Sequence, residues 1–340
     1  MRLGILNGGG DCAGLNAVTR AVVRKSEQFG YESVGIRHGW EGLLTPDTVQ
    51  LTWHDVSHII NQGGTILHTT RTNPFSRKDG SETVLENVKK LGLDALIAVG
   101  GEDTLSVAAK LSKMGLKVVA VPKTIDNDIV STDMTFGFDS AVSVTVEAID
   151  RIQTTGESHD RIMVVEVMGR DAGWIAAYAG IASGANIVLV PEEPFDLNEV
   201  AEFLKQRHAK GATASIVVVG EGCRLTGYPA SHTTQVDEFG HVRLGGIGEL
   251  LARELEKRVG IETRAVVLGH VVRGGAPSAY DRILATRLAV TAVQCVKDGK
   301  FGVMVCLRGN SILNVPIDSI LGKMKSLDPE TLSLIKDFNW

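Results

Sequence analysis

Short apolar runs alternate with longer amphipathic stretches along most of the chain. The apolar runs end at glycines or polar loops, which is typical of buried parallel strands, and the stretches between them have the period and length of helices. Strands are predicted at residues 3–6, 33–36, 96–99, 118–121, 162–167, 187–190, 216–219 and 265–268. Helices are predicted at residues 15–29, 105–114, 139–155, 198–209, 248–259 and 280–296.

This alternation predicts an α/β fold with mostly parallel sheets, because strands separated by helices form βαβ units. The chain has 340 residues and more predicted strands than one compact sheet holds, so we expect two α/β lobes. Residues 224–246 are polar and only weakly periodic, and we interpret them as a surface excursion rather than a separate domain.

Composition narrows the class of partner only a little. Hydrophobic residues make up 44% of the chain and charged residues 22%, and the net charge of −5 gives no basic field for nucleic acid or an anionic membrane surface. Cysteines 12, 223, 295 and 306 have no paired spacing, which favours reduced thiols in the cytoplasm. No apolar run approaches the roughly 18 residues of a membrane span. The chain starts with a strand instead of a signal-peptide apolar region, so we expect no secretory leader.

A glycine-rich loop at 7–14 lies between the first predicted strand and the first predicted helix. Glycines let the backbone approach an anion, and a helix N-terminus presents unpaired amides, so Gly9 and Gly10 are candidate phosphate contacts. The loop fits the permissive dinucleotide pattern G-x-G-x-x-A, but no acidic residue ends the second strand, and no Gly-Lys-Ser/Thr completes a Walker A loop. A tight turn without a ligand stays an alternative for this loop alone.

A second glycine loop follows the predicted strand at 96–99. It reads Gly-Gly-Glu-Asp-Thr from position 100, and it should share a crevice with the first loop because ligands of open α/β sheets bind at the carboxyl ends of strands. Glu102 and Asp103 place two carboxylates there. N-capping of the next helix is the simpler interpretation, and a magnesium ion bound by carboxylate and phosphate oxygens is the functional one.

The predicted strand at 118–121 leads into Pro-Lys-Thr-Ile-Asp-Asn-Asp at 122–128. Asp126 and Asp128 lie two residues apart, so in an extended loop their side chains share one side. One carboxylate could accept a proton from a hydroxyl while the other binds metal or orients the base. An Asx-rich turn would explain the aspartates and the asparagine but not Lys123 beside them.

Basic residues stand at strand ends or in glycine-rich contexts on separate loops. A single arginine is usually a solvated surface residue, but several at such positions suggest convergent anion clamps. The candidates are Arg71, Arg161, Arg170, Arg264, Arg273 and His270.

Together these segments resemble one family, the 6-phosphofructokinases. The resemblance is colinear from residue 1 to about 295, and it rests on residues 9–16, 100–101, 122–128, 165–170 and 268–275. It implies two Rossmann-like three-layer lobes that exchange segments, with the active site in the cleft between them. Residues 1–137 plus about 277–306 would form the donor-binding lobe, and residues 138–276 plus about 307–340 the fructose-6-phosphate-binding lobe. The last forty residues carry no recognisable motif.

The resemblance also implies a role for each matching residue. Asp126 is the expected base for the sugar 1-hydroxyl, with Asp128 as its catalytic neighbour. The residues expected to bind fructose 6-phosphate are Thr124, Met168, Gly169, Arg170, Glu221, His270 and Arg273. Arg161 and Arg264 would reach the sugar phosphate from an adjacent subunit, which implies a homo-oligomer, either dimer or tetramer. The expected donor contacts are Gly9, Gly10, Arg71, Gly101 and Thr104, and Glu102 is the expected ligand of Mg²⁺.

Asp103 and Lys123 address the phosphoryl donor. ATP-dependent bacterial members of the family have glycine at both positions, whereas the diphosphate-dependent members have this Asp and Lys. A carboxylate fills the space of a nucleotide α-phosphate and repels it by about 1 to 4 kcal/mol at about 4 Å. Lys123 then offers positive charge to a short, highly charged donor. Since some ATP-dependent members also carry the lysine, Asp103 decides the prediction: reversible, diphosphate-dependent phosphorylation of fructose 6-phosphate to fructose 1,6-bisphosphate.

Three other functions fit parts of the pattern. An ATP-dependent phosphofructokinase is the nearest, a lipid or NAD kinase lacks the 168–170 and 270–273 segments, and a non-catalytic sugar-phosphate sensor would not need Asp126. Arg20 and Arg24 match effector-site arginines of allosteric bacterial members. The other effector-site groups are replaced, with Ala-Thr-Ala at 212–214, Asn186 and Gln153, so we expect no allosteric control by ADP or phosphoenolpyruvate.

Overall fold

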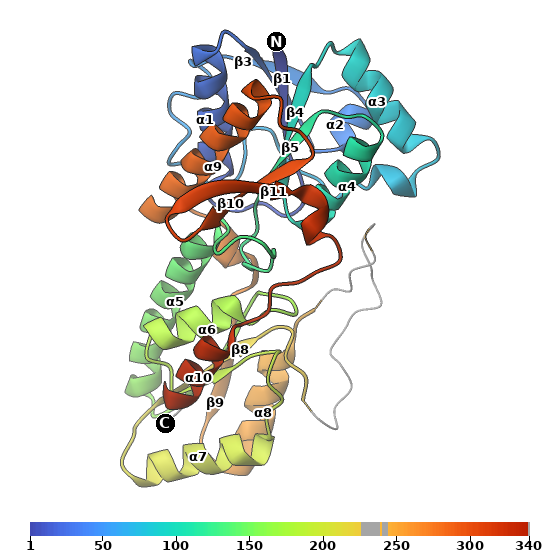
Figure 1. Cartoon of the computed structure of the whole chain (residues 1–340). Helices are drawn as coiled ribbons and strands as arrows, with labels where there is room; N and C mark the ends of the chain where they lie inside the picture. The colour runs from blue at the N-terminus through green and yellow to red at the C-terminus, as the bar shows by residue number, and fades with distance from the viewer. Residues whose placement is uncertain (226–238, 240–243, 339–340) are drawn as a thin grey trace.

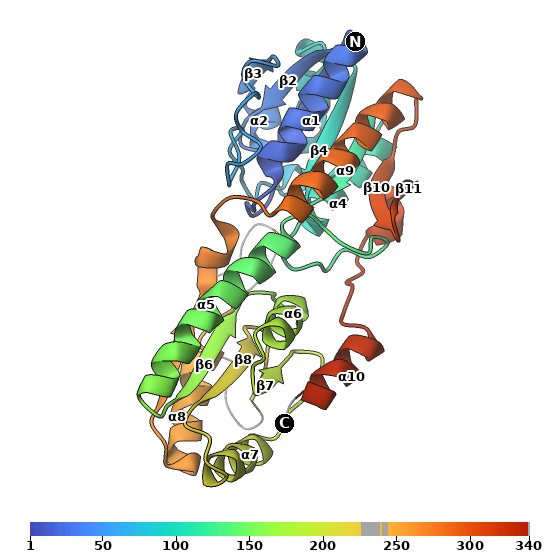
Figure 2. The ribbon, with the colours of Figure 1, turned by 90° about the vertical axis from the view of Figure 1, so that its left-hand side faces the viewer.

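The protein forms two α/β lobes that lie end to end (Figure 1). The computed structural model describes residues 1–225, 239 and 244–338. Most of the predicted surface excursion at 224–246 therefore lies outside the described residues. The N-terminus belongs to the first lobe, and the described chain ends in the second lobe (Figure 2). None of the helices within the described ranges is long and apolar enough to cross a membrane.

The first lobe contains a seven-stranded sheet with the order β11-β10-β5-β4-β1-β2-β3. Its five central strands run parallel, and the edge strands β3 and β11 each pair antiparallel with their neighbour. The strands are β1 (Arg2–Asn7), β2 (Glu32–Ile36), β3 (Thr48–Leu51), β4 (Ala95–Gly100), β5 (Val118–Pro122), β10 (Val303–Arg308) and β11 (Ser311–Pro316).

Helices cover both faces of this sheet because alternate residues of its central strands point to opposite sides. Ile97 and Val99 of β4 pack in one core with α1 (Leu15–Gln28) and α9 (Ala279–Lys297). Leu96 and Ala98 pack in the other core with α3 (Gly80–Lys90) and α4 (Glu102–Lys113). Figure 2 shows α1 and α9 side by side on their face of the sheet, and the short α2 (Glu41–Leu44) lies beside α3.

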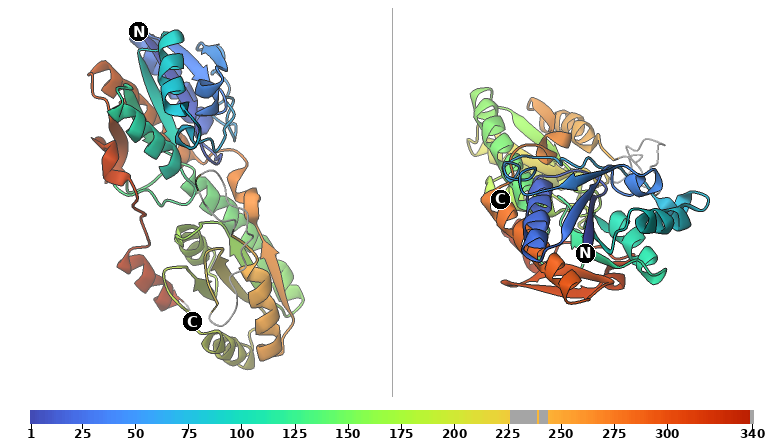
Figure 3. Two further views of the ribbon diagram at one scale, coloured as in Figure 1. Left: turned by 90° about the vertical axis from the view of Figure 1, so that its right-hand side faces the viewer. Right: turned by 90° about the horizontal axis from the view of Figure 1, so that it is seen from above.

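The second lobe contains a four-stranded parallel sheet with the order β7-β8-β6-β9. Its strands are β6 (Ile162–Val167), β7 (Ile187–Leu189), β8 (Ser215–Gly220) and β9 (Thr263–Val267). The helices α5 (Phe138–Ser158) and α6 (Trp174–Ala182) cover one face. The helices α7 (Leu197–Ala209) and α8 (Ile247–Val259) cover the other face, so both lobes have three layers. Figure 3 shows the two layered lobes from two further sides.

All eight predicted strands are present, which confirms the fold class. The first sheet extends past residue 306, where we expected the chain to leave the first lobe. The strand β10 runs to Arg308 and continues through a hairpin into β11, so the first sheet extends to Pro316 because β11 pairs along the whole of β10. Only then does the chain cross to the second lobe, where α10 (Pro329–Phe338) lies against α6.

Candidate active site

A cavity of about 280 Å³ opens where the loops after β1, β4 and β5 meet. Ligands of α/β sheets bind at this edge because the carboxyl ends of parallel strands lie together there. The second lobe contributes Arg170, Asp171 and Arg273, so the cavity lies between the two lobes. The lining residues are Gly9, Gly10, Arg71, Gly101, Glu102, Asp103, Thr104, Lys123, Thr124, Asp126, Asp128, Arg170, Asp171, Arg273, Gly322, Lys323 and Met324.

Thr104 joins the two glycine loops. Its buried side chain lies between Gly8 and Gly100, and a Cβ atom at either glycine would approach Thr104 side-chain atoms to 2.6 or 2.4 Å. Such a separation is shorter than any real packing contact, so both positions require glycine. The predicted meeting of the two glycine loops is therefore confirmed, and Thr104 is the residue that fixes their separation.

The segment that carries Arg71 is fixed by hydrogen bonds on both sides. Toward the cavity, the Gly9 amide donates to Thr70 O (3.0 Å), and Thr69 Oγ1 donates to Gly9 O (2.7 Å). Away from the cavity, Thr70 Oγ1 donates to His38 O (2.7 Å) and lies 2.9 Å from Thr72 Oγ1. The backbone around Arg71 is thus tied to the same loop that would hold a phosphate.

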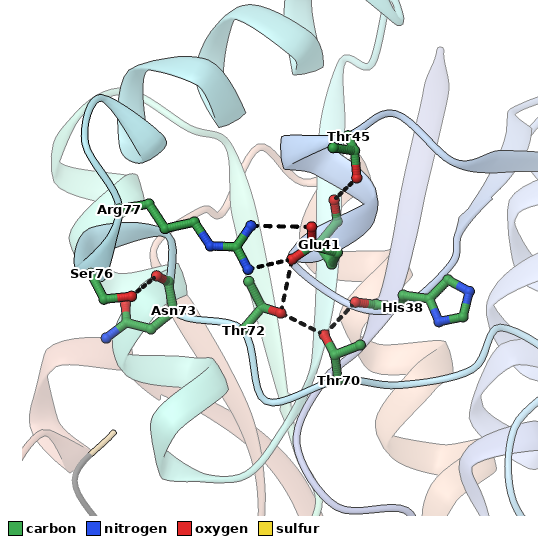
Figure 4. Close-up of polar contacts among 8 residues, drawn as sticks. All are labelled: His38, Glu41, Thr45, Thr70, Thr72, Asn73, Ser76 and Arg77. Atoms are coloured by element: carbon green, nitrogen blue, oxygen red, sulfur yellow. Dashed lines mark hydrogen bonds and ion pairs between the residues drawn. The ribbon is translucent and has the colours of Figure 1, made fainter. Parts of the chain in front are cut away.

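Glu41 anchors this network from the start of α2 (Figure 4). Its carboxylate accepts from Thr72 Oγ1 (3.1 Å) and from both terminal nitrogens of Arg77 (3.1 and 2.7 Å). The hydrogen bond from Arg77 is the main reason that the pKa of Glu41 lies below its ordinary value. Sequence reasoning missed Glu41, because no motif links it to Arg71.

Glu102 and Asp103 occupy the first turn of α4, which begins three residues before the predicted start at 105. Negative charge is favourable there because of the helix dipole. The N-cap of α4 is Gly101, and no side chain caps the helix, so capping does not account for the two acids. Both carboxylates line the cavity, and Glu102 Oε1 also accepts a hydrogen bond from the Gly322 amide (3.3 Å).

Lys123 crosses from the end of β5 to the first glycine loop. Its side chain is 3% exposed, and its ammonium donates a hydrogen bond to Gly10 O. Burial lowers the pKa of Lys123, and the guanidinium of Arg273 lowers it further, whereas nearby acidic groups oppose the shift. The lysine therefore brings one cation to the wall of the cavity from within the first lobe.

Asp126 and Asp128 both line the cavity, as predicted, although the backbone between them is not extended. Asn127 has a φ of 50°, and its Oδ1 accepts from the Thr135 amide (3.1 Å), so a left-handed turn rather than strand alternation brings the two acids to one side. Asp126 is 6% exposed, and among the described residues its Oδ1 has no hydrogen-bond partner. Burial, followed by repulsion from Asp126, raises the pKa of Asp128 to about 6.

In the second lobe, Glu221 holds the loop that carries Arg170. Its Oε1 accepts from the amides of Gly169 (3.3 Å) and Arg170 (3.1 Å). Burial raises the pKa of Glu221, and those two hydrogen bonds oppose the rise. Met168, Gly169 and Glu221 do not line the cavity. Glu221 instead holds the backbone of Gly169 and Arg170 in place through its two hydrogen bonds.

Arg273 crosses from the second lobe to the first glycine loop. Its Nη1 donates to Asp11 O (3.1 Å), and a Cβ at position 10 would lie 2.8 Å from the same nitrogen. The resemblance places Arg273 at the sugar phosphate, but here its guanidinium contacts the loop expected to bind the donor. Arg273 also lines the cavity between the two lobes.

The remaining sugar-phosphate candidates lie elsewhere in the described chain. Arg161 and Arg264 both pair with Glu262, at 2.9 and 2.5 Å. Arg161 directly precedes β6, whereas Arg170 follows it, so the pair with Glu262 lies at the opposite end of the sheet from the cavity. His270 is exposed in a short 3₁₀ segment and does not line the cavity.

Sequence reasoning missed the cavity residues Asp171, Gly322, Lys323 and Met324. Asp171 directly follows the Arg170 segment and could have been found from it. The other three come from the segment after β11, and no glycine loop or charge pattern there indicates a site. Their position depends on the long return of the chain past the first lobe.

The residues of the cavity fit a magnesium ion held together with a substrate. Among the described residues, no three potential ligands are grouped into a preformed metal site. Magnesium usually binds one or two carboxylates and completes its shell with water and phosphate oxygens, so it needs no such group. Glu102 and Asp103 supply carboxylates that line the cavity, and the buried Oδ1 of Asp126 has no hydrogen-bond partner within the described part of the chain.

The fold and the cavity are those of an α/β enzyme with a phosphate-binding edge, and comparison with known families makes this specific. The model of the phosphofructokinase family matches residues 2–296. This chain therefore belongs to the phosphofructokinase family.

The names of similar proteins specify two different phosphoryl donors, pyrophosphate and ATP. The chain is 55% identical over 332 residues to "Pyrophosphate--fructose 6-phosphate 1-phosphotransferase" of Amycolatopsis methanolica, with 97% of each chain covered. It is 49% identical over 333 residues to "ATP-dependent 6-phosphofructokinase 3" of Streptomyces coelicolor, with 96% of each covered. Among solved structures, phosphofructokinase from Saccharomyces cerevisiae superposes with a TM-score of 0.81 at 30% identity. That match covers 99% of this chain, which spans only 47% of the yeast chain.

Proposed function

We propose that this protein is a diphosphate-dependent phosphotransferase that converts D-fructose 6-phosphate to D-fructose 1,6-bisphosphate. The observation that carries the proposal is the cavity itself. It brings a buried carboxylate with an unpartnered oxygen, Asp126, together with the glycine loops, Lys123 and Asp103. The similar proteins named for pyrophosphate and fructose 6-phosphate support the same substrates.

In the proposed reaction, Asp126 accepts the proton of the sugar 1-hydroxyl. The resulting oxygen attacks the near phosphorus of diphosphate, the bond to the bridging oxygen breaks, and inorganic phosphate leaves. Phosphoryl transfer depends mainly on positioning and on stabilising charge over the transferred group. Lys123, Arg170 and the Gly9–Gly10 loop line the cavity in which that charge would develop.

Asp128 supports the base. Asp128 is half-buried and lines the same cavity as Asp126, and a left-handed turn at Asn127 holds the two acids on one side. Two carboxylates in one site cannot both ionise without penalty, which keeps a proton acceptor available near neutral pH. The pKa of about 6 at Asp128 agrees with this coupling.

Asp103 is the proposed basis of donor choice. It lies in the first turn of α4, beside Gly101 and facing the same cavity as Lys123. A fixed carboxylate there repels the extra phosphate of a nucleotide, whereas diphosphate ends before that point. The relative named as ATP-dependent is almost as similar to this chain, so overall similarity alone does not decide the donor.

Magnesium would bind to Glu102 together with oxygens of the donor. When bound, the ion neutralises donor charge and polarises the phosphoryl oxygens. Because diphosphate drives the reaction less strongly than ATP, we also propose that it runs in both directions.

A homo-oligomer, either dimer or tetramer, completes the proposal. Within one chain Arg161 and Arg264 lie away from the cavity, so they could act only on the sugar phosphate of an adjacent subunit. We further propose a cytoplasmic location, which the four free, buried cysteines support. We also propose that ADP and phosphoenolpyruvate exert no allosteric control.

Phosphorus NMR tests the reaction directly. The protein with fructose 6-phosphate, diphosphate and Mg²⁺ should produce one new sugar 1-phosphate and one inorganic phosphate per turnover. Fructose 1,6-bisphosphate with inorganic phosphate should regenerate diphosphate. If neither direction gives product while ATP does, the donor proposal fails; if no donor gives product, the catalytic proposal fails as well.

A further inference from the structure

The segment 322–327, here called the C-terminal strap, contacts both lobes at the cavity. It follows β11 and leads to α10, so it passes from the first lobe to the second (Figure 2). On the first lobe, Gly322 donates to Glu102 Oε1 (3.3 Å), and Met324 pairs with Ile129 in an isolated antiparallel bridge. On the second lobe, the Leu327 amide donates to Glu192 Oε1 (3.1 Å).

Lys325 makes the central contacts of the strap. Its backbone amide donates to Asp128 O (2.7 Å), so the strap is bonded directly to a residue of the proposed catalytic pair. Its ammonium donates to Thr132 O (3.1 Å) and Asp133 O (2.8 Å) at the far end of the same loop. One lysine thus binds three carbonyl groups of the 128–133 loop.

The same lysine is fixed to the second lobe through Trp174 at the start of α6. The indole nitrogen donates to Lys325 O (2.9 Å), and the ammonium lies 5.0 Å from the centre of the ring. A cation over an aromatic face is attracted to it, and more strongly where water is excluded. The side chain is partly buried, and burial lowers the pKa of Lys325 to about 8 although Asp133 and Asp128 oppose that shift.

Contacts within the first lobe also hold this loop, including the hydrogen bond from the Gly309 amide to Asp133 Oδ2 (2.6 Å) and the packing of the buried Ile129. The later part of the loop is tied to β10 by the Asp133 amide, which donates to Leu307 O (2.9 Å), and by Thr132 Oγ1, which accepts from the Leu307 amide (3.1 Å). A carbonyl group without a partner would cost free energy and would leave the loop free to move. The strap adds hydrogen bonds at both ends of the loop, and through Trp174 these bonds link the Asp126–Asp128 turn to the second lobe.

We propose that Lys325 is a positioning residue that holds the Asp126–Asp128 turn in place against the second lobe. The proposal rests on the proposed function, because it assumes that this turn carries the base. Lys325 does not line the cavity, so it acts through Asp128 and its loop rather than on a substrate.

The test compares Lys325→Met, Lys325→Arg and the control Lys336→Met. Methionine keeps an apolar stem over Trp174 and removes the ammonium. Lys336 is a matched lysine farther along the C-terminal region, 63% exposed and paired with Glu193 at the surface. Misplacement of reacting groups by about 1 Å can cost about 100-fold in rate.

We expect Lys325→Met to lower kcat by about 10- to 100-fold while the KM for each substrate changes less than about threefold. Lys325→Arg should recover part of the loss because it restores a donor, and Lys336→Met should match the wild type. A purely structural role would lower the melting temperature and the fraction of active protein without this selective loss of kcat in the folded protein. Wild-type kcat in folded Lys325→Met overturns the proposal.

If Lys325→Met does not fold, Trp174→Phe provides the second test. It replaces the indole with a smaller aromatic ring and removes the hydrogen bond to Lys325 O. A reduced kcat with unchanged KM values and an unchanged melting temperature supports the proposal, and an unchanged kcat overturns it. A wild-type protein inactive with every donor would instead show that the proposed function itself is wrong.

Discussion

The two lobes contribute unequally to the described lining of the cavity. On the first lobe, the glycine loops, Arg71, Lys123 and the acidic first turn of α4 all face one space and are tied to one another. Among the described residues of the second lobe, Arg170, Asp171 and Arg273 line that space, whereas Arg161 and Arg264 pair with Glu262 elsewhere. The side of the cavity that we propose to bind the donor is thus built from many residues of the first lobe, whereas few described residues form the side that we propose to bind the sugar phosphate.

This difference follows from where the loops originate. The first-lobe loops leave the carboxyl ends of three neighbouring parallel strands, so the sheet alone brings them together. The second-lobe residues sit on the far side of an interlobe gap and depend on the relative position of the lobes. Changes on the donor side should therefore affect rate and donor choice, and changes on the sugar side should affect sugar binding.

The largest expected effect is on the catalytic side. Asp126→Asn should lower kcat by about 10² to 10⁴, the usual contribution of a general base, and leave fructose 6-phosphate binding nearly unchanged. Steady-state kinetics and calorimetric titration with the sugar phosphate measure the two quantities. Asp79→Asn, an exposed aspartate of the same lobe, is the control. Turnover within twofold of the wild type would remove Asp126 from its role.

The donor preference should respond next. Asp103→Gly combined with Lys123→Gly removes the carboxylate and the cation expected to favour diphosphate. The ratio of kcat/KM for ATP to that for diphosphate should rise about ten- to several-hundred-fold, the range expected for removing about 1 to 4 kcal/mol of repulsion. The absolute rate should fall because Lys123 also stabilises the transferred group. An unchanged ratio would place donor choice elsewhere, for example near His68.

The sugar side should show a binding effect across subunits. Arg161→Ala and Arg264→Ala should each raise the KM for fructose 6-phosphate by about tenfold, the loss of one charged hydrogen bond, while the KM for diphosphate stays constant. Initial rates with each substrate varied in turn test this. Unchanged sugar KM values in both variants would contradict the proposed role of these arginines.

The pH dependence separates activity from stability at Asp128. Its pKa is raised from 3.8 to about 6, so protonation below pH 6 should lower kcat/KM by up to tenfold per pH unit. A carboxyl group with a raised pKa binds its proton more tightly in the folded state, so its contribution to stability is greatest at low pH and is lost as pH rises through about 6. Activity should thus fall between pH 6 and pH 5, whereas protonation of Asp128 should not destabilise the folded protein. In Asp128→Asn the remaining activity should lose this acidic limb; a retained limb would assign it to another group.

The smallest effect concerns the network behind Arg71. Glu41→Gln weakens the pair with Arg77 and the contact with Thr72 that fix the Arg71 segment. The KM for diphosphate should rise about two- to fivefold, an energy of up to about 1 kcal/mol, with the sugar KM unchanged. Glu86→Gln, an exposed glutamate of α3 paired with Lys90, is the matched control. Equal donor KM values in both variants would show that the network does not act on donor binding.

The sequence was sufficient to predict those strands and loops that a local hydrophobic pattern encodes. Buried parallel strands have continuous apolar runs, so β1, β2, β4 and β5 of the first sheet and all four strands of the second sheet were predictable. The loops that follow β1, β4 and β5 contain many of the residues that line the cavity. The edge strands β3 and β11 were not predicted, because both are short or largely exposed and alternate polar and apolar residues weakly. The buried parallel strand β10 was also not predicted, although residues 303–307 are all apolar.

Other features depended on distant contacts. The turn at Asn127 replaces the extended backbone assumed for Asp126 and Asp128, because Thr135 binds the asparagine side chain. The contact between Gly322 and Glu102 joins residues 220 positions apart. No local period encodes such a contact, so the strap and Lys325 could be recognised only from the fold.

A comparison of initial rates with diphosphate and with ATP tests the central claim most directly. Fructose 6-phosphate and Mg²⁺ are held constant, and the donor is varied. We expect rapid formation of fructose 1,6-bisphosphate with diphosphate, at a kcat/KM at least about tenfold above that with ATP. Activity with ATP and none with diphosphate would contradict it.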